Sequence, residues 1–307
     1  MAAMFCIPRD LVYNRRMLGR SSPVSGIFST EENRYMRKKV LAIIMTAAMA
    51  VMAVACGNTQ TQSAAPADGQ AQAETPATDA DGKVWVIATD TVFKPFEYTD
   101  DSGNFVGIDV DILAAIAEDQ GFKYELKSLG WDASIAACQA GQADGMIAGA
   151  SITDERKASG WIFSDGYYEA DQSMAVAANS DIKGFEDLKG ASVAVKTASM
   201  SATYAEELSK EYGFTVTYFE DSPTVYQAVV GGQVAACFDD TPIMASTIKD
   251  SGIAMKLVEG TGNEPAEYGF AVFTKDSQEL VDKFNKGLAN IKANGKYDEI
   301  IAKYLGE

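Results

Sequence analysis

A single arginine stands out in the larger part of this 307-residue chain. Beyond Cys56 every other cationic side chain is a lysine, and Arg156 ends the stretch 151–156, which reads SITDER. A guanidinium offers a planar fork of donors that holds a carboxylate through two hydrogen bonds, which a lysine ammonium cannot do. Placed in a glycine- and serine-rich loop after the apolar run 146–148, Arg156 is predicted to bind an anion. The alternative is a surface ion pair with Asp154 or Glu155.

Two series of strand and helix signals would position this loop. In the first, apolar runs predict strands at 84–88, 123–126 and 146–148, and amphipathic patterns predict helices at 109–120, stopped by Gly121, and at 132–140. In the second series, we expect strands at 192–195, 215–219 and 234–238 and a helix at 201–212 that Gly213 stops. A further helix is expected to end at Val230, with Ser222 as its N-cap and Pro223 at N1. The strand–helix alternation predicts α/β units with mostly parallel sheets.

The repetition of the pattern predicts two lobes. We expect lobe 1 at 83–173 plus 270–307, including helices near 278–292 and 296–305, and lobe 2 at 174–269. The extended stretches 173–178 and 268–274 are predicted to cross between the lobes as a hinge. A cleft between lobes is a preferred place for a small ligand.

The N-terminal third carries targeting signals rather than a core. Residues 36–55 combine a basic start, an apolar run of about 16 residues and small residues before Cys56, as in a bacterial lipoprotein signal whose cysteine is lipidated. The alternative is an ordinary signal peptide with a spectator cysteine, since Ala53 stands where a lipobox usually has leucine. Residues 1–35 precede this signal and are interpreted as a start-site artefact or a cytoplasmic extension. Residues 56–82 are rich in Ala, Gln and Thr and predict a disordered tether.

Composition excludes several classes of function. Residues 1–55 hold 8 of the 26 Lys and Arg and 3 of the 43 Asp and Glu, so the remainder has 18 basic and 40 acidic side chains and a net charge near −22. That charge argues against nucleic acid as a partner. The chain has no histidine, and Cys138 and Cys237 lie in apolar runs typical of buried free thiols. We therefore predict no metal site and no cofactor.

Seven short blocks occur in an order that resembles a known family. They are TDTVFKPFEY at 89–98, GIDVDI at 107–112, WDASI at 131–135, SITDER at 151–156, FSDGYY at 163–168, DDTP at 239–242 and GKY at 295–297. This series resembles the family 3 extracellular solute-binding proteins, the polar amino-acid receptors of ABC importers. The resemblance covers essentially all of residues 83–307. It implies a two-lobed fold of the periplasmic-binding-protein type (type II).

The resemblance also implies roles for particular residues. Arg156 would hold a ligand α-carboxylate with help from Ser151, and Asp240 would pair with the α-ammonium. Phe93 and Trp131 would pack on the ligand side chain, and Ser199 would donate to the carboxylate at the start of a helix. The set of implied ligand-binding residues is completed by Asp90 and Lys196, which would set side-chain selectivity, and by Gly149 and Asp239. No catalytic residue is predicted.

The expected function is that of a monomeric, lipid-anchored receptor on the extracellular face of the membrane, or in the periplasm of a Gram-negative cell. It would close on a polar amino acid and deliver it to a membrane permease. Glutamine-like and basic amino acids both fit, and cystine stays open. The alternatives are a dehydratase-like enzyme on the same fold, with Asp239 or Glu97 as acid or base, and a ligand-sensing module.

Overall fold

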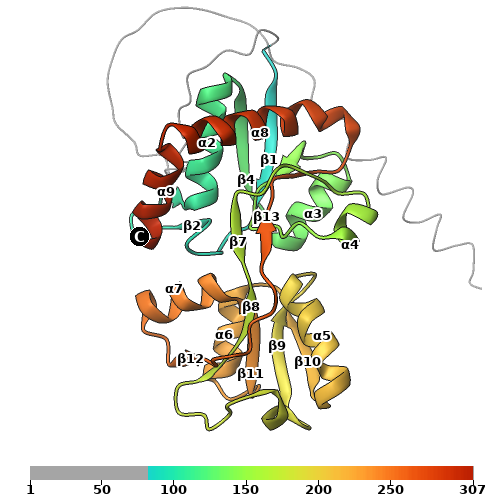
Figure 1. Cartoon of the computed structure of the whole chain (residues 1–307), viewed down its shortest axis with the longest axis vertical. Coiled ribbons are helices and arrows are strands. Elements are labelled where there is room, and N and C mark those ends of the chain that lie inside the picture. Colours follow the sequence, from blue (N-terminus) through green and yellow to red (C-terminus); the bar gives the residue numbers. More distant parts are fainter. Residues whose placement is uncertain (1–81, 307) are drawn as a thin grey trace, which may run out of the picture. The chain divides into compact units, whose positions relative to one another are not determined.

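The computed structural model describes residues 82–306 of the chain. The predictions for residues 1–35, for the signal at 36–55, for Cys56 and for the tether up to residue 81 lie outside the described residues. In the described part, two separate five-stranded sheets form the centres of two lobes (Figure 1). The prediction of a two-lobed α/β fold is confirmed.

The first sheet has the strand order β4-β1-β5-β14-β6. Its strands are β1 (Val84–Thr89), β4 (Lys123–Ser128), β5 (Gly145–Met146), β6 (Ile162–Phe163) and β14 (Ala271–Val272). β1 pairs in parallel with β4 and β5, and β14 runs antiparallel to β5 and β6. The helices of this lobe are α2 (Ile108–Gln120), α3 (Trp131–Gln139), α4 (Asp154–Ala158), α8 (Gln278–Ala293) and α9 (Lys296–Leu305). A short hairpin, β2 (Tyr98–Thr99) and β3 (Phe105–Val106), precedes α2.

The second sheet has the order β10-β9-β11-β8-β12. Its strands are β8 (Gln172–Ala177), β9 (Ser192–Lys196), β10 (Thr215–Phe219), β11 (Ala236–Asp240) and β12 (Met255–Leu257). β9 is parallel to β10 and β11, and β8 is antiparallel to β11 and β12. Helices α5 (Met200–Tyr212), α6 (Ser222–Val230) and α7 (Thr241–Ser251) complete the lobe. β11 starts two residues later than predicted and runs to Asp240, so the strand itself carries both aspartates.

A two-stranded antiparallel ribbon connects the lobes. It consists of β7 (Tyr168–Ala170) and β13 (Ala266–Tyr268), which lie between the two sheets in Figure 1. The predicted crossings at 173–178 and 268–274 were therefore wrong in detail, because β8 already belongs to the second sheet from Gln172 and β14 belongs to the first. Apolar runs mark strands inside a sheet, whereas these crossing strands read YEA and AEY and carry no such signal.

Local sequence signals set the helix ends. Gly121 and Gly213 end α2 and α5 in the left-handed conformation, as their positions predicted. The N-cap of α6 differs from the prediction: Asp221, not Ser222, accepts the Thr224 N–H at 2.8 Å. Both residue types cap helices well, so sequence alone does not choose between neighbours.

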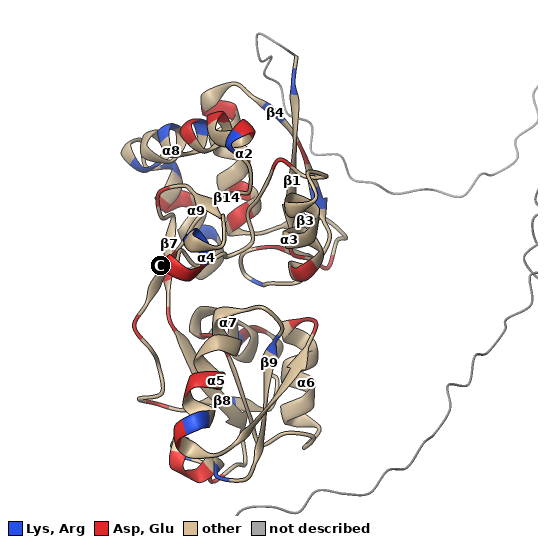
Figure 2. Ribbon diagram, turned by 90° about the vertical axis from the view of Figure 1, so that its right-hand side faces the viewer, with Lys and Arg blue, Asp and Glu red and all other residues tan. Residues whose placement is uncertain are grey.

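Burial and charge follow the expectations from composition. Cys138 and Cys237 are buried free thiols. Asp and Glu residues occur on elements of both lobes (Figure 2). Within residues 82–306, no helix combines the length and hydropathy needed to cross a bilayer.

Candidate functional site

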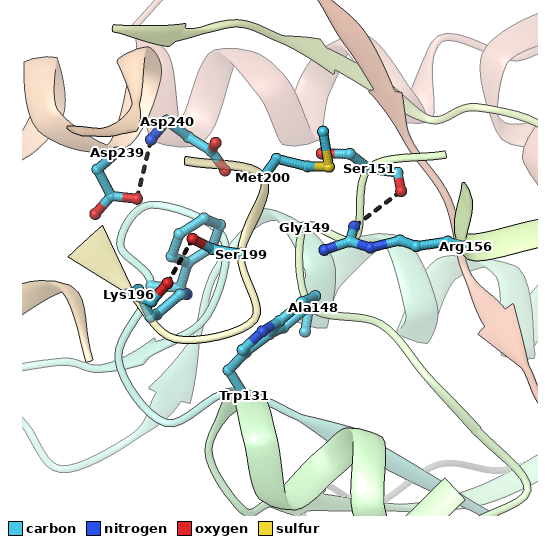
Figure 3. Close-up of a pocket in the computed structure, with 11 residues that line it drawn as sticks. Trp131, Ala148, Gly149, Ser151, Arg156, Lys196, Ser199, Met200, Asp239 and Asp240 are labelled. Carbon is cyan, nitrogen blue, oxygen red and sulfur yellow. Dashed lines mark hydrogen bonds between the residues drawn. The ribbon is translucent and has the colours of Figure 1, made fainter. Parts of the chain in front are cut away.

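One pocket gathers nearly all of the residues that the sequence singled out. The empty space in it, part of which is open to solvent, is about 270 Å³, and its lining consists of Phe93, Trp131, Ala148, Gly149, Ser151, Arg156, Lys196, Ser199, Met200, Asp239 and Asp240. Every predicted ligand-binding residue except Asp90 is among them. Figure 3 shows Arg156 entering from one side and the two aspartates from the other. A pocket in which charged, hydroxyl and aromatic side chains converge is suited to a small polar molecule.

Arg156 lies on the short helix α4 rather than in a loop, which corrects the prediction. Thr153 caps this helix by accepting the Arg156 N–H at 3.1 Å. The guanidinium donates to the carbonyl oxygens of Ser151 at 2.9 Å and Ala198 at 3.4 Å. Its centre is 5.2 Å from the ring of Trp131. The side chain is thus held in place by carbonyl and aromatic contacts.

The alternative of a surface ion pair for Arg156 does not hold in the described part of the chain. Neither Asp154 nor Glu155 forms an ion pair with it there, and Asp154 instead lies 3.9 Å from Lys157. Burial lowers the pKa of Arg156 to about 10, against the opposing effect of Asp240. The guanidinium is therefore charged at neutral pH, and since it has five N–H donors it can bind an anion beside the two carbonyl oxygens that it contacts.

Lys196 and Asp90 form a buried ion pair that crosses between the lobes. Lys196 ends β9 in the second lobe and Asp90 follows β1 in the first, and their charged atoms are 3.2 Å apart with side chains only 4% and 3% exposed. Burial opposes the charge on Lys196, but Asp90, Asp239 and Asp240 outweigh it, so the pKa of Lys196 is raised. Asp90 itself does not line the pocket. Lys196 and Asp90 are therefore buried partners and not solvated side chains.

The ammonium group of Lys196 also contacts the two aromatic rings that line the pocket, those of Phe93 and Trp131. Its Nζ atom is 4.2 Å from the centroid of the Phe93 ring and 5.3 Å from that of Trp131. Such distances give a favourable cation–π contact. The two rings expected to contact a ligand side chain therefore already face a cation of the protein.

Asp240 is held by one donor on the connecting ribbon, Tyr268, and by one on the neighbouring strand β8, Gln172. Gln172 Nε2 donates to Oδ1 at 2.7 Å, and the Tyr268 hydroxyl donates to Oδ2 at 2.6 Å. Asp240 occupies the N-cap position of α7, but its side chain makes no capping hydrogen bond, so it does not serve as a helix cap. Burial, together with the neighbouring Asp239, raises the pKa of Asp240 to about 6. At neutral pH it is an anion facing the pocket.

The loop before α5 contributes backbone rather than side-chain chemistry. The Ser199 hydroxyl accepts the Ala202 N–H at 3.1 Å as the N-cap and donates to the Lys196 carbonyl at 2.6 Å. Its hydroxyl hydrogen is therefore committed to the protein. Ala198 has a positive φ of 55°, and its carbonyl accepts from Trp131 Nε1 at 3.2 Å as well as from Arg156. A contact of this kind carries no side-chain signal, so the sequence did not reveal it.

Gly149 shapes the pocket floor. Its φ is +58°, and a Cβ atom there would lie 2.5 Å from the Cε1 atom of Phe93. Its N–H donates to Asp109 Oδ2 at 2.9 Å, and the same oxygen accepts from the Tyr167 hydroxyl at 2.9 Å. Only glycine meets both the conformation and the close contact without strain.

Two carboxyl groups are buried beneath this floor. Burial raises the pKa of Asp109 to about 7. Burial and the nearby Asp109 and Asp90 carboxyls also raise the pKa of Glu97 well above its usual range. Glu97 is 0% exposed and is not among the residues that line the pocket. Asp239 does line the pocket, with Oδ2 accepting from the Tyr226 hydroxyl at 2.8 Å.

The comparison with known proteins agrees with this geometry. Residues 85–307 match the model of the bacterial extracellular solute-binding proteins, family 3. The chain belongs to this family. A protein named "Probable histidine-binding protein" from Neisseria gonorrhoeae is 31% identical over 274 residues, which cover 89% of this chain and 97% of the relative. The ABC transporter glutamine-binding protein GlnH of Bacillus subtilis (strain 168) is 30% identical over 275 residues, covering 88% and 98%.

A solved structure supports the same assignment. This family member is similar to an ancestral arginine-binding protein bound to arginine, with a TM-score of 0.66 and 35% identity over 72% of this chain and 97% of the other. These relatives are named for binding different amino acids. Membership in the family therefore does not identify the ligand of this chain, and the argument for a ligand has to come from the residues of its own pocket.

Proposed function

We propose that this protein is the substrate-binding receptor of an ABC importer, which captures a free amino acid in the pocket and delivers it to a membrane permease. The observation that carries the proposal is the placement of Arg156 and Asp240, opposite charges from different lobes, on one small cavity. An amino acid is a zwitterion, so its carboxylate matches the guanidinium and its ammonium matches the carboxylate.

The two-lobed arrangement supplies a mechanism for capture. Arg156 belongs to the first lobe and Asp240 to the second, so only a closed arrangement engages both ends of the ligand. A ligand that interacts more strongly with the closed form shifts the equilibrium between open and closed forms towards it. The permease would recognise the closed form. The pocket groups all match ligand binding, and we propose no catalytic role for any of them.

Among the amino acids that fit, we propose one with an uncharged polar side chain, such as glutamine. A basic side chain would need an unpaired carboxylate or an open aromatic face. Asp90 is already paired with Lys196, and both oxygens of Asp239 already accept hydrogen bonds, from the Tyr226 hydroxyl and the Asp240 N–H. The Lys196 cation already covers the rings of Phe93 and Trp131. A second cation at this end of the pocket would meet Lys196 in a weakly screened environment, which is unfavourable. An amide can accept from Lys196 without that repulsion.

A thermal-shift screen with the twenty amino acids, cystine and ornithine tests the proposal. A ligand at a hundred times its Kd adds about 2.7 kcal/mol to the free energy of unfolding. We expect glutamine to give the largest shift. A ligand-free, folded protein that responds to no amino acid would contradict the receptor function.

The Arg156→Lys variant tests the carboxylate role directly. Lysine keeps the charge but loses the fork, so we expect the Kd for the ligand to rise at least about tenfold by calorimetry. The control is Lys157→Arg, the next residue on α4, which is exposed and does not line the pocket. Equal affinities of wild type and Arg156→Lys would exclude Arg156 as the carboxylate ligand.

We further propose that residues 36–55 direct secretion, that lipidated Cys56 anchors a monomer on the extracellular face of the membrane, and that residues 57–82 act as the tether. The sequence pattern around Cys56 supports this. We expect a Cys56→Ser variant to be released into the medium or periplasm, as detected by membrane fractionation. Retention of that variant in the membrane would refute the anchor.

A further inference from the structure

One side chain that holds Asp240 comes from the ribbon that joins the lobes, and the other comes from the strand of the second sheet that follows this ribbon. Tyr268 is the last residue of β13, and Gln172 is the first residue of β8, two positions after the end of β7. One donates to each oxygen of the Asp240 carboxylate, at 2.7 Å and 2.6 Å. A carboxylate has about four acceptor positions, so both oxygens can still accept from a ligand ammonium.

Tyr268 is also fixed to the part of the site that binds the carboxylate. Its backbone forms an antiparallel bridge with Ser151, whose carbonyl accepts from Arg156. Backbone hydrogen bonds on either side, from Ile152 N to Glu267 O at 2.7 Å and from Gly269 N to Ala150 O at 2.9 Å, hold this register. The side chain is fully buried, with its ring centroid 5.3 Å from that of Phe96. Tyr268 thus connects the two charged ends of the pocket through one rigid residue.

The second donor is oriented just as firmly. Asn263 donates through Nδ2 to Gln172 Oε1 at 2.9 Å and accepts the Gln172 N–H at 2.7 Å. Because Oε1 is used in this way, the Gln172 amide can only present its Nε2 donor to Asp240. Both donors on Asp240 are therefore set by contacts outside the pocket.

We propose that Tyr268, assisted by Gln172, is a positioning residue that keeps Asp240 ionised and aimed at the α-ammonium of the ligand, and so links ammonium recognition to the hinge. The inference rests on the proposed function, since it assigns the ammonium to Asp240. Neither Tyr268 nor Gln172 lines the pocket. They act only through Asp240.

The groups around Asp240 define what a change in pH does. Asp239 on β11 disfavours its charge, Lys196 on β9 favours it, and the hydrogen bonds from Tyr268 and Gln172 favour it too. Arg156 on α4 is a further facing cation. With the pKa of Asp240 raised to about 6 by burial, the carboxylate is ionised above that pH and becomes protonated below it. Ligand affinity is therefore expected to fall as pH decreases through about 6.

The test is the pH profile of L-glutamine binding to the full-length chain, measured by calorimetry between about pH 4.5 and 8. Tyr268→Phe removes only the hydroxyl, so Asp240 loses a donor that stabilises its charged form. We expect the Kd near pH 8 to rise about tenfold. We also expect the pH at which affinity is lost to move upward relative to wild type. A purely structural loss would weaken binding without moving that pH.

Tyr204→Phe is the matched control. It removes a partly buried phenol hydrogen bond of the second lobe, to the Thr261 carbonyl at 3.0 Å, without touching Asp240. Its pH profile is expected to coincide with that of wild type. Gln172→Met removes the donor on the other Asp240 oxygen and serves if Tyr268→Phe does not fold, with the same upward shift expected.

An unchanged pH of affinity loss in Tyr268→Phe, or in Gln172→Met in its place, would overturn the proposal whatever the absolute affinities are. A wild-type chain that binds no L-glutamine at any pH would instead refute the proposed ligand. The two failures are distinguishable, because the second is seen without any variant.

Discussion

Replacing Lys196 with methionine tests how the pocket selects among amino acids. Methionine has nearly the same length as lysine but carries no charge, so Lys196→Met leaves Asp90 buried without its partner. The ion pair it removes has a separation of 3.2 Å and side chains only 4% and 3% exposed. The same change frees the faces of Phe93 and Trp131 from the Lys196 cation.

The geometry of the ion pair allows the loss of unfolding free energy in Lys196→Met to be estimated. Two unit charges at 3.2 Å in a medium of effective dielectric constant near 20 attract by about 5 kcal/mol. Removing one member of a buried pair typically costs about 3–5 kcal/mol, because the other charge stays unpaired. We therefore expect the ligand-free variant to lose about 3 kcal/mol of unfolding free energy. We also expect its affinity for glutamine to fall and its affinity for arginine to rise, because a guanidinium can replace the missing cation.

The assay combines urea unfolding with calorimetric titration of glutamine and arginine. Lys303→Met is the control, since Lys303 pairs with Asp111 at the shorter distance of 2.7 Å but with side chains 58% and 29% exposed. An exposed pair contributes about 0–1 kcal/mol, so this variant is expected to stay close to wild type in stability and selectivity. If Lys196→Met bound glutamine as tightly as wild type and arginine no better, the proposed role of Lys196 in selecting an uncharged ligand side chain would be refuted.

Two further variants address the pocket floor. Gly149→Ala places a Cβ 2.5 Å from Phe93 at φ +58°, and we expect lower stability and weaker ligand binding than in Gly121→Ala, which has φ +67° but open space around it. Urea unfolding and calorimetry measure both effects, and equal losses in the two variants would exclude crowding against Phe93. Asp109→Asn removes a buried acid whose pKa is raised to about 7, from an unfolded value near 4. Folding then favours the protonated form, so wild-type stability is expected to fall as pH rises from about 4 through 7 and the variant to show a flatter profile. If urea unfolding gave the same pH dependence of stability for wild type and Asp109→Asn, the raised pKa of Asp109 would be excluded as its cause.

Residue types and order predicted much of the fold. Apolar runs located the strands at the centres of both sheets, and Gly121 and Gly213 marked two helix ends, because a left-handed cap strongly favours glycine. The crossing strands were misplaced, because a short polar ribbon resembles a loop in sequence. Arg156 was expected in a loop for a similar reason, since a five-residue helix has no detectable period.

The sequence predicted most residues of the candidate site, but it did not predict which of them contact one another. The sequence named Asp90 and Lys196, but nothing in it reveals that two side chains 106 positions apart form an ion pair. Asp109 belongs to a motif block, yet its contact with Gly149 depends on tertiary packing. The Ala198 carbonyl has no side-chain signature at all. Contacts of this kind are made by the packing of one element on another.

The ion pair between Asp90 and Lys196 connects selectivity with closure. The pair crosses from the first lobe to the second, as does the hydrogen bond from Trp131 to Ala198. Separation of the lobes would break both contacts and leave Asp90 and Lys196 without each other. A ligand whose side chain accepts from Lys196 strengthens this crossing contact, whereas a cationic side chain competes with it. If the proposed function holds, this one pair of buried charges would both select the amino acid and favour closure of the lobes on it.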